Sequence, residues 1–185
     1  SSMTKALISI DYSYDFVADD GKLTAGKPAQ AIEDRIAQVT QEAYDNGDYI
    51  FVAMDRHDEG DTFHPETKLF PPHNIAGTSG RELYGKLAGV YDAIKDDNRV
   101  FWMDKRHYSA FSGTDLDIRL RERRVTTVVL TGVLTDICVL HTAIDAYNLG
   151  YDIEVVESAT ASLTPEAHDF AIGHFKNVLG ATIVE

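Results

Sequence analysis

The sequence predicts an α/β fold, specifically a three-layer α/β/α sandwich around a mainly parallel six-stranded sheet. Short apolar, β-branched runs alternate along the chain with longer stretches whose apolar residues recur at helical spacing. This alternation is typical of parallel strands that are joined by right-handed helical crossovers, with helices on both faces of the sheet. The length of 185 residues suits one such unit, so residues 1–185 are expected to form a single domain.

The strands and helices follow in order from local signals. Strands are expected over residues 6–10, 49–54, 100–103, 125–131, 153–156 and 182–184. Helices are expected over residues 28–46, from about 79 to 94, around 116–120, over 139–149 and from 165 to about 178. Gly47 and Gly150 end two of these helices, because glycine readily adopts the left-handed conformation that stops a helix. Thr164 as N-cap and Pro165 at the first helical position begin the last helix.

Residues 56–80 stand out because they lack clear periodicity and contain three prolines. A connection of this length inside a compact domain is more often functional than an ordinary loop. We therefore expect part of a site in this segment.

The charge and composition exclude several classes of partner. The net charge of −13 repels the phosphates of nucleic acid, so no nucleic-acid partner is expected. No apolar run is long enough to span a membrane. A single cysteine forms no internal disulfide, which is consistent with a reducing, cytoplasmic location.

Cys138 is that cysteine, and it lies between the strand over 125–131 and the helix over 139–149. Near the start of a helix, unpaired backbone N–H groups and the helix dipole favour the thiolate, which is the nucleophilic form of cysteine. A lone cysteine is also commonly a small buried hydrophobe. Position alone therefore leaves both a catalytic role and a packing role open.

Other reactive side chains follow the predicted strands. Asp11 follows the first strand, Asp55 and His57 the second, and Lys105 the third. Because ligands bind at the carboxyl ends of strands in open α/β sheets, we expect these residues to meet Cys138 at one edge. Asp11 is then a candidate base, if poor solvation raises its pKa, and Lys105 a candidate partner for the thiolate. Taken singly, Asp11 also suits a turn cap and Lys105 a solvated surface position.

A second group of polar residues suggests a metal site. Three of the seven histidines, His57, His64 and His73, lie within residues 57–73, together with Asp55 and Glu66. Imidazole and carboxylate ligands suit Zn²⁺ and also Mn²⁺ or Fe²⁺. The Asp-x-His pattern alone also occurs on ordinary polar surfaces, so the prediction depends on the whole group.

Motifs along nearly the whole chain resemble nicotinamidases of the isochorismatase-like cysteine hydrolase superfamily. The matching segments are residues 6–11 with Asp15-Phe16, Asp55-Arg-His57, His73-Asn-Ile-Ala-Gly-Thr-Ser-Gly-Arg-Glu-Leu83, Lys105-Arg-His-Tyr-Ser-Ala-Phe111 and Gly132-Val-Leu-Thr-Asp-Ile-Cys138. The resemblance implies a metal-dependent cysteine amidohydrolase that converts nicotinamide to nicotinate and ammonia through a thioester, and that also deamidates pyrazinamide. Its pathway would be NAD salvage.

The resemblance also implies roles for particular residues. It implies a catalytic triad of Asp11, Lys105 and Cys138, and an oxyanion hole made by the backbone N–H groups of Leu134 and Cys138. A cis peptide bond between Val133 and Leu134 is typical of the family.

For the cofactor, the resemblance implies one divalent metal per chain, with zinc expected and manganese or iron also compatible. The implied ligands are Asp55, His57, Glu66 and His73. His64 competes with Glu66 for the third position, and we favour Glu66. Relatives are often dimers or tetramers, so a homo-oligomer is expected.

The aromatic side chains of Phe16, Phe70 and Tyr108 are expected to line the pocket around the substrate ring.

Other functions remain open as alternatives. They are an N-carbamoylsarcosine amidase-like enzyme, an isochorismatase-like hydrolase, or a metal-binding or thiol-sensing protein without catalysis.

Overall fold

The structure, a computed structural model, describes residues 4–185 and contains one six-stranded sheet. The strands are β1 (Lys5–Ile10), β2 (Tyr49–Asp55), β3 (Val100–Lys105), β4 (Thr127–Val133), β5 (Asp152–Ala161) and β6 (Thr182–Val184). Their order is β3-β2-β1-β4-β5-β6, and every neighbouring pair is parallel. All six predicted strands are thus confirmed, whereas residues 1–3 of the predicted domain lie outside the described part of the chain.

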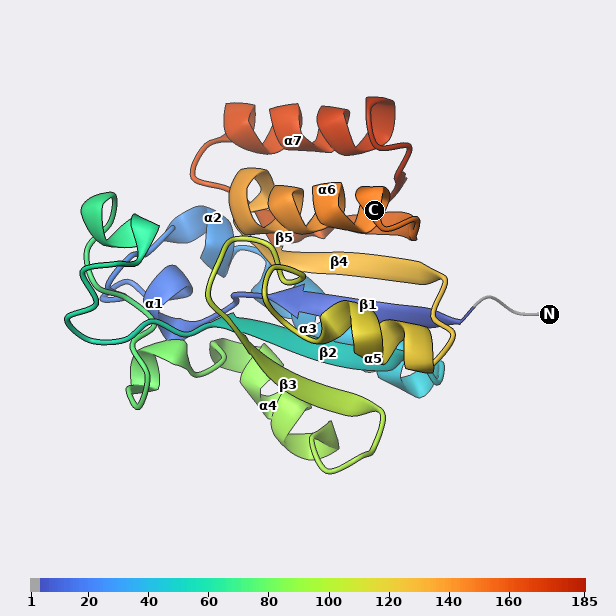
Figure 1. Ribbon diagram of the computed structural model, residues 1–185, viewed down its shortest axis with the longest axis horizontal. Helices are drawn as coiled ribbons and strands as arrows, with labels where there is room; N and C mark the ends of the chain where they lie inside the picture. Colours follow the sequence, from blue (N-terminus) through green and yellow to red (C-terminus); the bar gives the residue numbers. More distant parts are fainter. Residues whose placement is uncertain (1–3) are drawn as a thin grey trace.

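Helices cover both faces of the sheet, which confirms the predicted three layers (Figure 1). The helices are α1 (Tyr14–Val17), α2 (Lys27–Gln30), α3 (Glu33–Asp45), α4 (Gly85–Ile94), α5 (Leu116–Glu122), α6 (Leu140–Asn148) and α7 (Pro165–Asn177). Apolar side chains of α2, α3 and α4 pack on one face and those of α5, α6 and α7 on the other. Along β1, Leu7 faces the core under α2, α3 and α4, and Ile8 faces the core under α5, α6 and α7, because successive strand residues point to opposite faces. Within residues 4–185, no helix is long and apolar enough to cross a membrane.

The helix predicted over residues 28–46 is interrupted. It forms as α2 and α3, separated at Ala31 and Ile32, and Ile32 has non-helical dihedral angles of φ −93° and ψ 5°. The side chain of Ile32 is buried in the core with those of α3. Apolar periodicity continues across the break, so the pattern alone does not reveal it.

The second predicted helix begins later than expected. Residues Ser79–Arg81 form only a 3₁₀ turn, and α4 starts at Gly85. Between them the chain is extended, because Leu83 pairs with Ser13 in an antiparallel bridge and the Tyr84 N–H donates to the Tyr12 carbonyl at 3.0 Å. This long-range pairing outweighs the local helical preference.

Gly132 in β4 is the position least tolerant of a side chain. Its φ is +114°, and an added Cβ would lie 2.0 Å from the carbonyl oxygen of Ile10 on β1. We expect Gly132→Ala to lower the free energy of unfolding by about 2–3 kcal/mol, measured by urea denaturation. Gly47→Ala is the matched control, because Gly47 also has a positive φ (+87°) but nothing within 4 Å. Equal losses in the two variants would contradict the predicted clash.

Candidate active site

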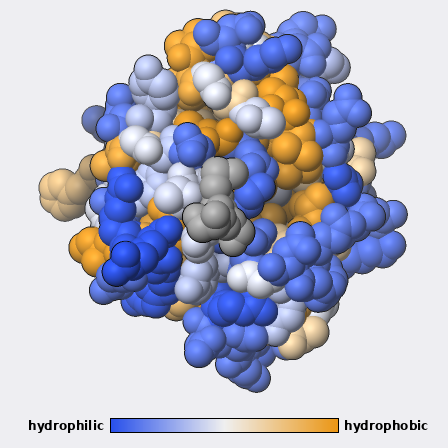
Figure 2. Space-filling model, turned by 90° about the vertical axis from the view of Figure 1, so that its right-hand side faces the viewer, coloured by the Kyte–Doolittle hydropathy of each residue, from blue (hydrophilic) through white to orange (hydrophobic). Residues whose placement is uncertain are grey.

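The candidate site lies at the carboxyl end of the sheet, beside the point where the strand order reverses. In the order β3-β2-β1-β4-β5-β6 this point falls between β1 and β4, and ligands commonly bind there in open α/β sheets. Asp11 directly follows β1, and Cys138 follows β4 after a short turn. The opposite end, where the strands begin, presents a mainly hydrophilic surface with scattered apolar patches (Figure 2).

Lys105 connects the reactive groups. Its side chain is fully buried, and Nζ lies 2.8 Å from Asp11 Oδ2, 2.5 Å from Asp55 Oδ1 and 3.5 Å from Cys138 Sγ. Nζ also donates to the carbonyl oxygens of His107 and Tyr108 at 2.9 and 3.1 Å. Burial acts to lower the pKa of Lys105, but the two carboxylates outweigh it and raise the pKa well above its ordinary value. Lys105 is therefore a charged ammonium.

Asp11 has the properties of a base that works near neutral pH. Burial, with the nearby charge of Asp55, raises the pKa of Asp11 to about 6, although Lys105 opposes the shift. The Asp55 N–H donates to Asp11 Oδ1 at 2.9 Å and fixes the carboxyl group. The other oxygen, Oδ2, faces the ammonium of Lys105. Asp11 is thus held by two neighbouring strands and is ionised at pH 7.

Cys138 is a buried thiol rather than a resting thiolate. It is only 6% exposed, and this burial raises its pKa well above the ordinary value; Lys105 opposes the rise, while Asp11 and Asp55 add to it. The expected preference for thiolate at a helix start is therefore wrong for the resting site, because desolvation outweighs it. Sγ remains within reach of both Asp11 and Lys105, so a proton has a nearby acceptor.

The backbone around Cys138 is irregular. The peptide bond between Val133 and Leu134 is cis. The following residues, Thr135–Val139, form a wide turn in which the Val139 N–H donates to the Leu134 carbonyl at 3.2 Å, and α6 begins only at Leu140. Turns of this i→i+5 type are frequent at functional sites. Cys138 thus lies in a turn that precedes the predicted helix, not within a regular first turn.

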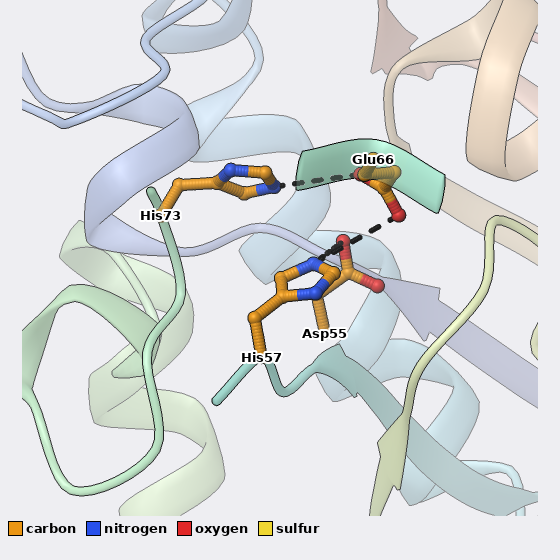
Figure 3. Close-up of side chains that lie close together, drawn as sticks. All are labelled: Asp55, His57, Glu66 and His73. Atoms are coloured by element: carbon orange, nitrogen blue, oxygen red, sulfur yellow. Dashed lines mark ion pairs between the residues drawn. The ribbon is translucent and has the colours of Figure 1, made fainter. Parts of the chain in front are cut away.

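A second group lies next to Lys105, where Asp55, His57, Glu66 and His73 point toward one another (Figure 3). All four are buried, and each offers a ligand atom within 4.8 Å of the others. His57 Nε2 lies 3.6 Å from Asp55 Oδ2 and 3.9 Å from Glu66 Oε2, and His73 Nε2 lies 3.6 Å from Glu66 Oε1. These are the same four residues that the family resemblance implies as ligands.

The chain brings His73 beside His57 through backbone pairing. The His57 N–H donates to the Asn74 carbonyl at 3.0 Å, and the Ala76 N–H donates to the His57 carbonyl at 2.8 Å. His73 Nδ1 lies 2.8 Å from the Pro71 carbonyl, a contact that places the proton on Nδ1 and leaves Nε2 free to bind a cation.

The group fits a divalent cation. His57 Nε2 and His73 Nε2 are buried nitrogens without a hydrogen-bond partner in the described residues. Leaving such groups unpaired is costly, and a cation between them would satisfy both. Two imidazoles and two carboxylates form a donor set that zinc, manganese and iron accept.

His64 does not belong to this group, because both of its ring nitrogens are used elsewhere. Nδ1 accepts the Glu66 N–H at 3.1 Å, and Nε2 lies 2.6 Å from the Arg106 carbonyl oxygen. Of the two candidates for the third ligand, the structure therefore brings Glu66 into the cluster. His64 instead supports Glu66, a role that spacing along the sequence does not reveal.

We expect His64→Ala to weaken metal binding by about 10- to 100-fold, because the backbone of Glu66 loses its support. His64→Asn is the matched control, since its side-chain oxygen can still accept the Glu66 N–H. Competition with a chromogenic chelator measures both affinities. Unchanged affinity in the alanine variant would contradict the supporting role.

Of the three predicted wall residues, Phe70 and Tyr108 line two different cavities. The ring centroids of Phe16 and Phe70 lie 5.2 and 6.3 Å from that of His73, so both rings adjoin the metal-ligand group. Phe70 lines a cavity of about 370 Å³ together with His57, Glu66 and His73. Tyr108 lines a different cavity of about 400 Å³, which also includes Glu66. A shared substrate wall therefore stays a prediction.

Asp55 has a second role that the sequence analysis missed. It was assigned only to the metal, yet its Oδ1 contacts Lys105 while its Oδ2 faces His57. Asp55 and Lys105 are register partners at the ends of β2 and β3. Asp55 directly follows the strand predicted over 49–54 and Lys105 lies two residues after the one predicted over 100–103, and this similar position is the signal that could have revealed the pair.

Comparisons with known proteins agree with this geometry. The isochorismatase domain matches residues 5–184. The chain is similar to the crystal structure of pyrazinamidase/nicotinamidase from Streptococcus mutans UA159, with 81% identity over 98% of this chain and 100% of that chain, and a TM-score of 0.97. It is also similar to nicotinamidase/pyrazinamidase PncA from Bacillus subtilis, with 55% identity over 99% and 100% of the two chains and a TM-score of 0.97.

A more distant likeness is to the pyrazinamidase of Pyrococcus horikoshii, which was solved in complex with zinc. It is 27% identical over 98% of both chains, with a TM-score of 0.84. Fold, matched domain and high identity over the full length lead to one conclusion. The chain belongs to the isochorismatase family.

Proposed function

We propose that this chain is a nicotinamidase, a metal-dependent cysteine amidohydrolase that converts nicotinamide to nicotinate and ammonia. The observation that carries the proposal is the buried contact of Lys105 with Asp11 and Cys138, directly beside four side chains suited to a cation. The similar structures from Streptococcus mutans and Bacillus subtilis are described as pyrazinamidase/nicotinamidase and nicotinamidase/pyrazinamidase, so pyrazinamide is proposed as a second substrate.

Asp55, His57, Glu66 and His73 would hold one divalent cation, with zinc the first choice and manganese or iron as alternatives. When bound, the cation supplies a Lewis-acid anchor for the ring nitrogen of the substrate. A ring anchored in this way would hold the carboxamide at a fixed distance from Cys138, and such orientation is a large part of catalysis.

The first half of the reaction depends on Asp11 and Cys138. Asp11 takes the thiol proton, and the sulfur forms a bond to the amide carbon. The backbone N–H groups of Leu134 and Cys138 donate to the resulting oxyanion, an effect of roughly 3–4 kcal/mol for one donor. Asp11 then gives its proton to the amide nitrogen, the C–N bond breaks, and ammonia leaves a thioester. Lys105 remains an ammonium throughout and balances the charge on Asp11.

The second half releases the acid. Asp11, again ionised, takes a proton from water while the water oxygen bonds to the thioester carbon. The C–S bond breaks, and the proton held by Asp11 returns to the sulfur of Cys138. Nicotinic acid then ionises to nicotinate, and the site is restored.

Ammonia release from nicotinamide tests the proposal, with benzamide as control because it has the same carboxamide but no ring nitrogen. We expect turnover of nicotinamide only, a loss of at least about 100-fold after chelation, and recovery when Zn²⁺ is restored. Elemental analysis should give about one metal per chain, as expected for a single four-ligand group. A metal-loaded chain that releases no ammonia, or that hydrolyses benzamide equally well after chelation, would refute the proposed function.

A homo-oligomeric state, dimer or tetramer, and a cytoplasmic location stay predictions. Light scattering at micromolar concentration tests the first of these.

A further inference from the structure

A side-chain tether connects α7 to the turn that precedes Cys138. The Thr135 hydroxyl lies 2.8 Å from His168 Nδ1, and Thr135 is fully buried. On the other side of the ring, His168 Nε2 lies 3.6 Å from Glu157 Oε2 in the middle of β5. With Nε2–H directed at this carboxylate, Nδ1 is left to accept the Thr135 hydroxyl proton.

His168 is itself firmly placed. It lies in the first turn of α7, where its backbone N–H donates to the Thr164 carbonyl at 3.1 Å, and the Thr164 hydroxyl accepts the Ala167 N–H at 3.1 Å. The ring thus projects from the capped end of a 13-residue helix that packs against the turn. Ser162, just before this helix, donates to Asp136 Oδ1 and adds a second tie to the same turn.

The tethered turn needs external support because it is irregular. It follows the cis bond at Leu134 and is closed by the wide Val139-to-Leu134 hydrogen bond rather than by regular α-helical bonds. Thr135 lies between the two residues whose N–H groups are proposed to bind the oxyanion, Leu134 and Cys138. Rotation at Thr135 would move both donors, and a donor displaced by more than about 0.5 Å from its productive position loses much of its effect on the oxyanion.

We propose that His168 is a positioning residue for the oxyanion-binding turn, acting through the Thr135 hydroxyl. The inference rests on the proposed amidase function and extends it to a side chain that touches neither substrate nor metal ligand. A hydrogen bond from the turn to α7 keeps the Leu134 and Cys138 N–H groups aimed at the same point, and Glu157 holds the imidazole in the required orientation.

Three substitutions at this position separate the two contacts of the ring. His168→Asn keeps an acceptor at the place of Nδ1 but loses the reach to Glu157. His168→Gln reaches toward Glu157 but not Thr135, and His168→Ala loses both. We expect kcat for ammonia release to fall about 10-fold or more in the alanine and glutamine variants, with KM within about twofold, because an oxyanion forms only after substrate binding. The asparagine variant should retain most of kcat.

His174→Ala is the matched control, since His174 lies on the same helix and its ring stacks on the exposed Phe170 instead of contacting the turn. It should leave kcat unchanged. Thermal unfolding of every variant distinguishes local repositioning from general loss of stability.

Pyridine-3-carbaldehyde provides a second readout besides turnover. Its carbonyl carbon bonds to the sulfur of Cys138, the C=O π pair moves to oxygen, and the thiol proton ends on that oxygen in a hemithioacetal. The oxygen occupies the oxyanion position, so the Kd of the aldehyde should rise in step with the loss of kcat in His168→Ala. The Kd of nicotinate should not change.

The outcomes separate the tether from the proposed function. If the metal-loaded wild-type chain releases no ammonia, the amidase function fails, and this inference with it. If the wild type is active and His168→Ala stays within twofold of its kcat, the tether alone is overturned. Equal losses in the asparagine, glutamine and alanine variants, with lower unfolding temperatures and no selective loss of aldehyde binding, would also overturn it.

Discussion

Cys138→Ser should abolish ammonia release from nicotinamide, with kcat reduced by at least about 10³-fold. Serine preserves the size of the side chain, but its hydroxyl is a far weaker acid than a thiol. A base such as Asp11, whose pKa is about 6, cannot ionise it to a useful extent. Initial rates of ammonia release at saturating nicotinamide measure the effect, and urea denaturation verifies that the variant is folded.

The same residue offers an independent check, because Cys138 is the only cysteine in the chain. Iodoacetamide should label the wild type at one site, nicotinamide should slow the labelling, and Cys138→Ser should not be labelled. Turnover of the serine variant at the wild-type rate, or labelling that nicotinamide does not slow, would contradict the assignment of Cys138 as nucleophile.

The second large effect is expected for Asp11→Asn, which should lower kcat by about 10³-fold. Asparagine keeps the shape of the side chain and an oxygen that can accept the Asp55 N–H, but it cannot take the thiol proton. Lys105 retains Asp55 as a carboxylate partner, so the ammonium is not left unpaired. Loss of activity would thus report the missing base rather than a collapsed site.

Asp104→Asn is the matched control for this substitution. Asp104 precedes Lys105 on β3, but its exposed carboxylate contacts Arg81 instead of the buried groups. We expect near-normal kcat in this variant. If the two asparagine variants lose activity equally, Asp11 does not act as the specific base.

The sequence predicts the sheet well because each strand is a short β-branched run between clear helix signals. All six strands form, and helix ends marked by Thr164 and Pro165 lie where the local signals place them. The late start of α4 is an error that arises because distant pairing decides the local structure there. Leu83 is drawn into an extended segment by Ser13, about 70 residues earlier in the chain, and no local pattern contains that information.

The site, like the fold, has features that the sequence predicts and features that depend on the folded structure. The rule that ligands bind at the carboxyl ends of strands correctly gathers Asp11, Lys105 and Cys138. The protonation state of Cys138 could not be predicted in the same way, because it depends on how much water reaches the sulfur and not on its place near a helix. The choice between His64 and Glu66 likewise required the partners of the two His64 ring nitrogens.

The two oxygens of Asp55 have a practical consequence for mutagenesis. One oxygen faces His57 and the other contacts Lys105, so a single carboxylate belongs to both the metal-ligand group and the group around Cys138. A substitution of Asp55 would both weaken cation binding and release Lys105 beside Cys138. A loss of activity in such a variant would therefore not show which of the two effects caused it. His73, which contacts neither Lys105 nor Cys138 in the described contacts, is the ligand at which cation dependence can be dissected cleanly.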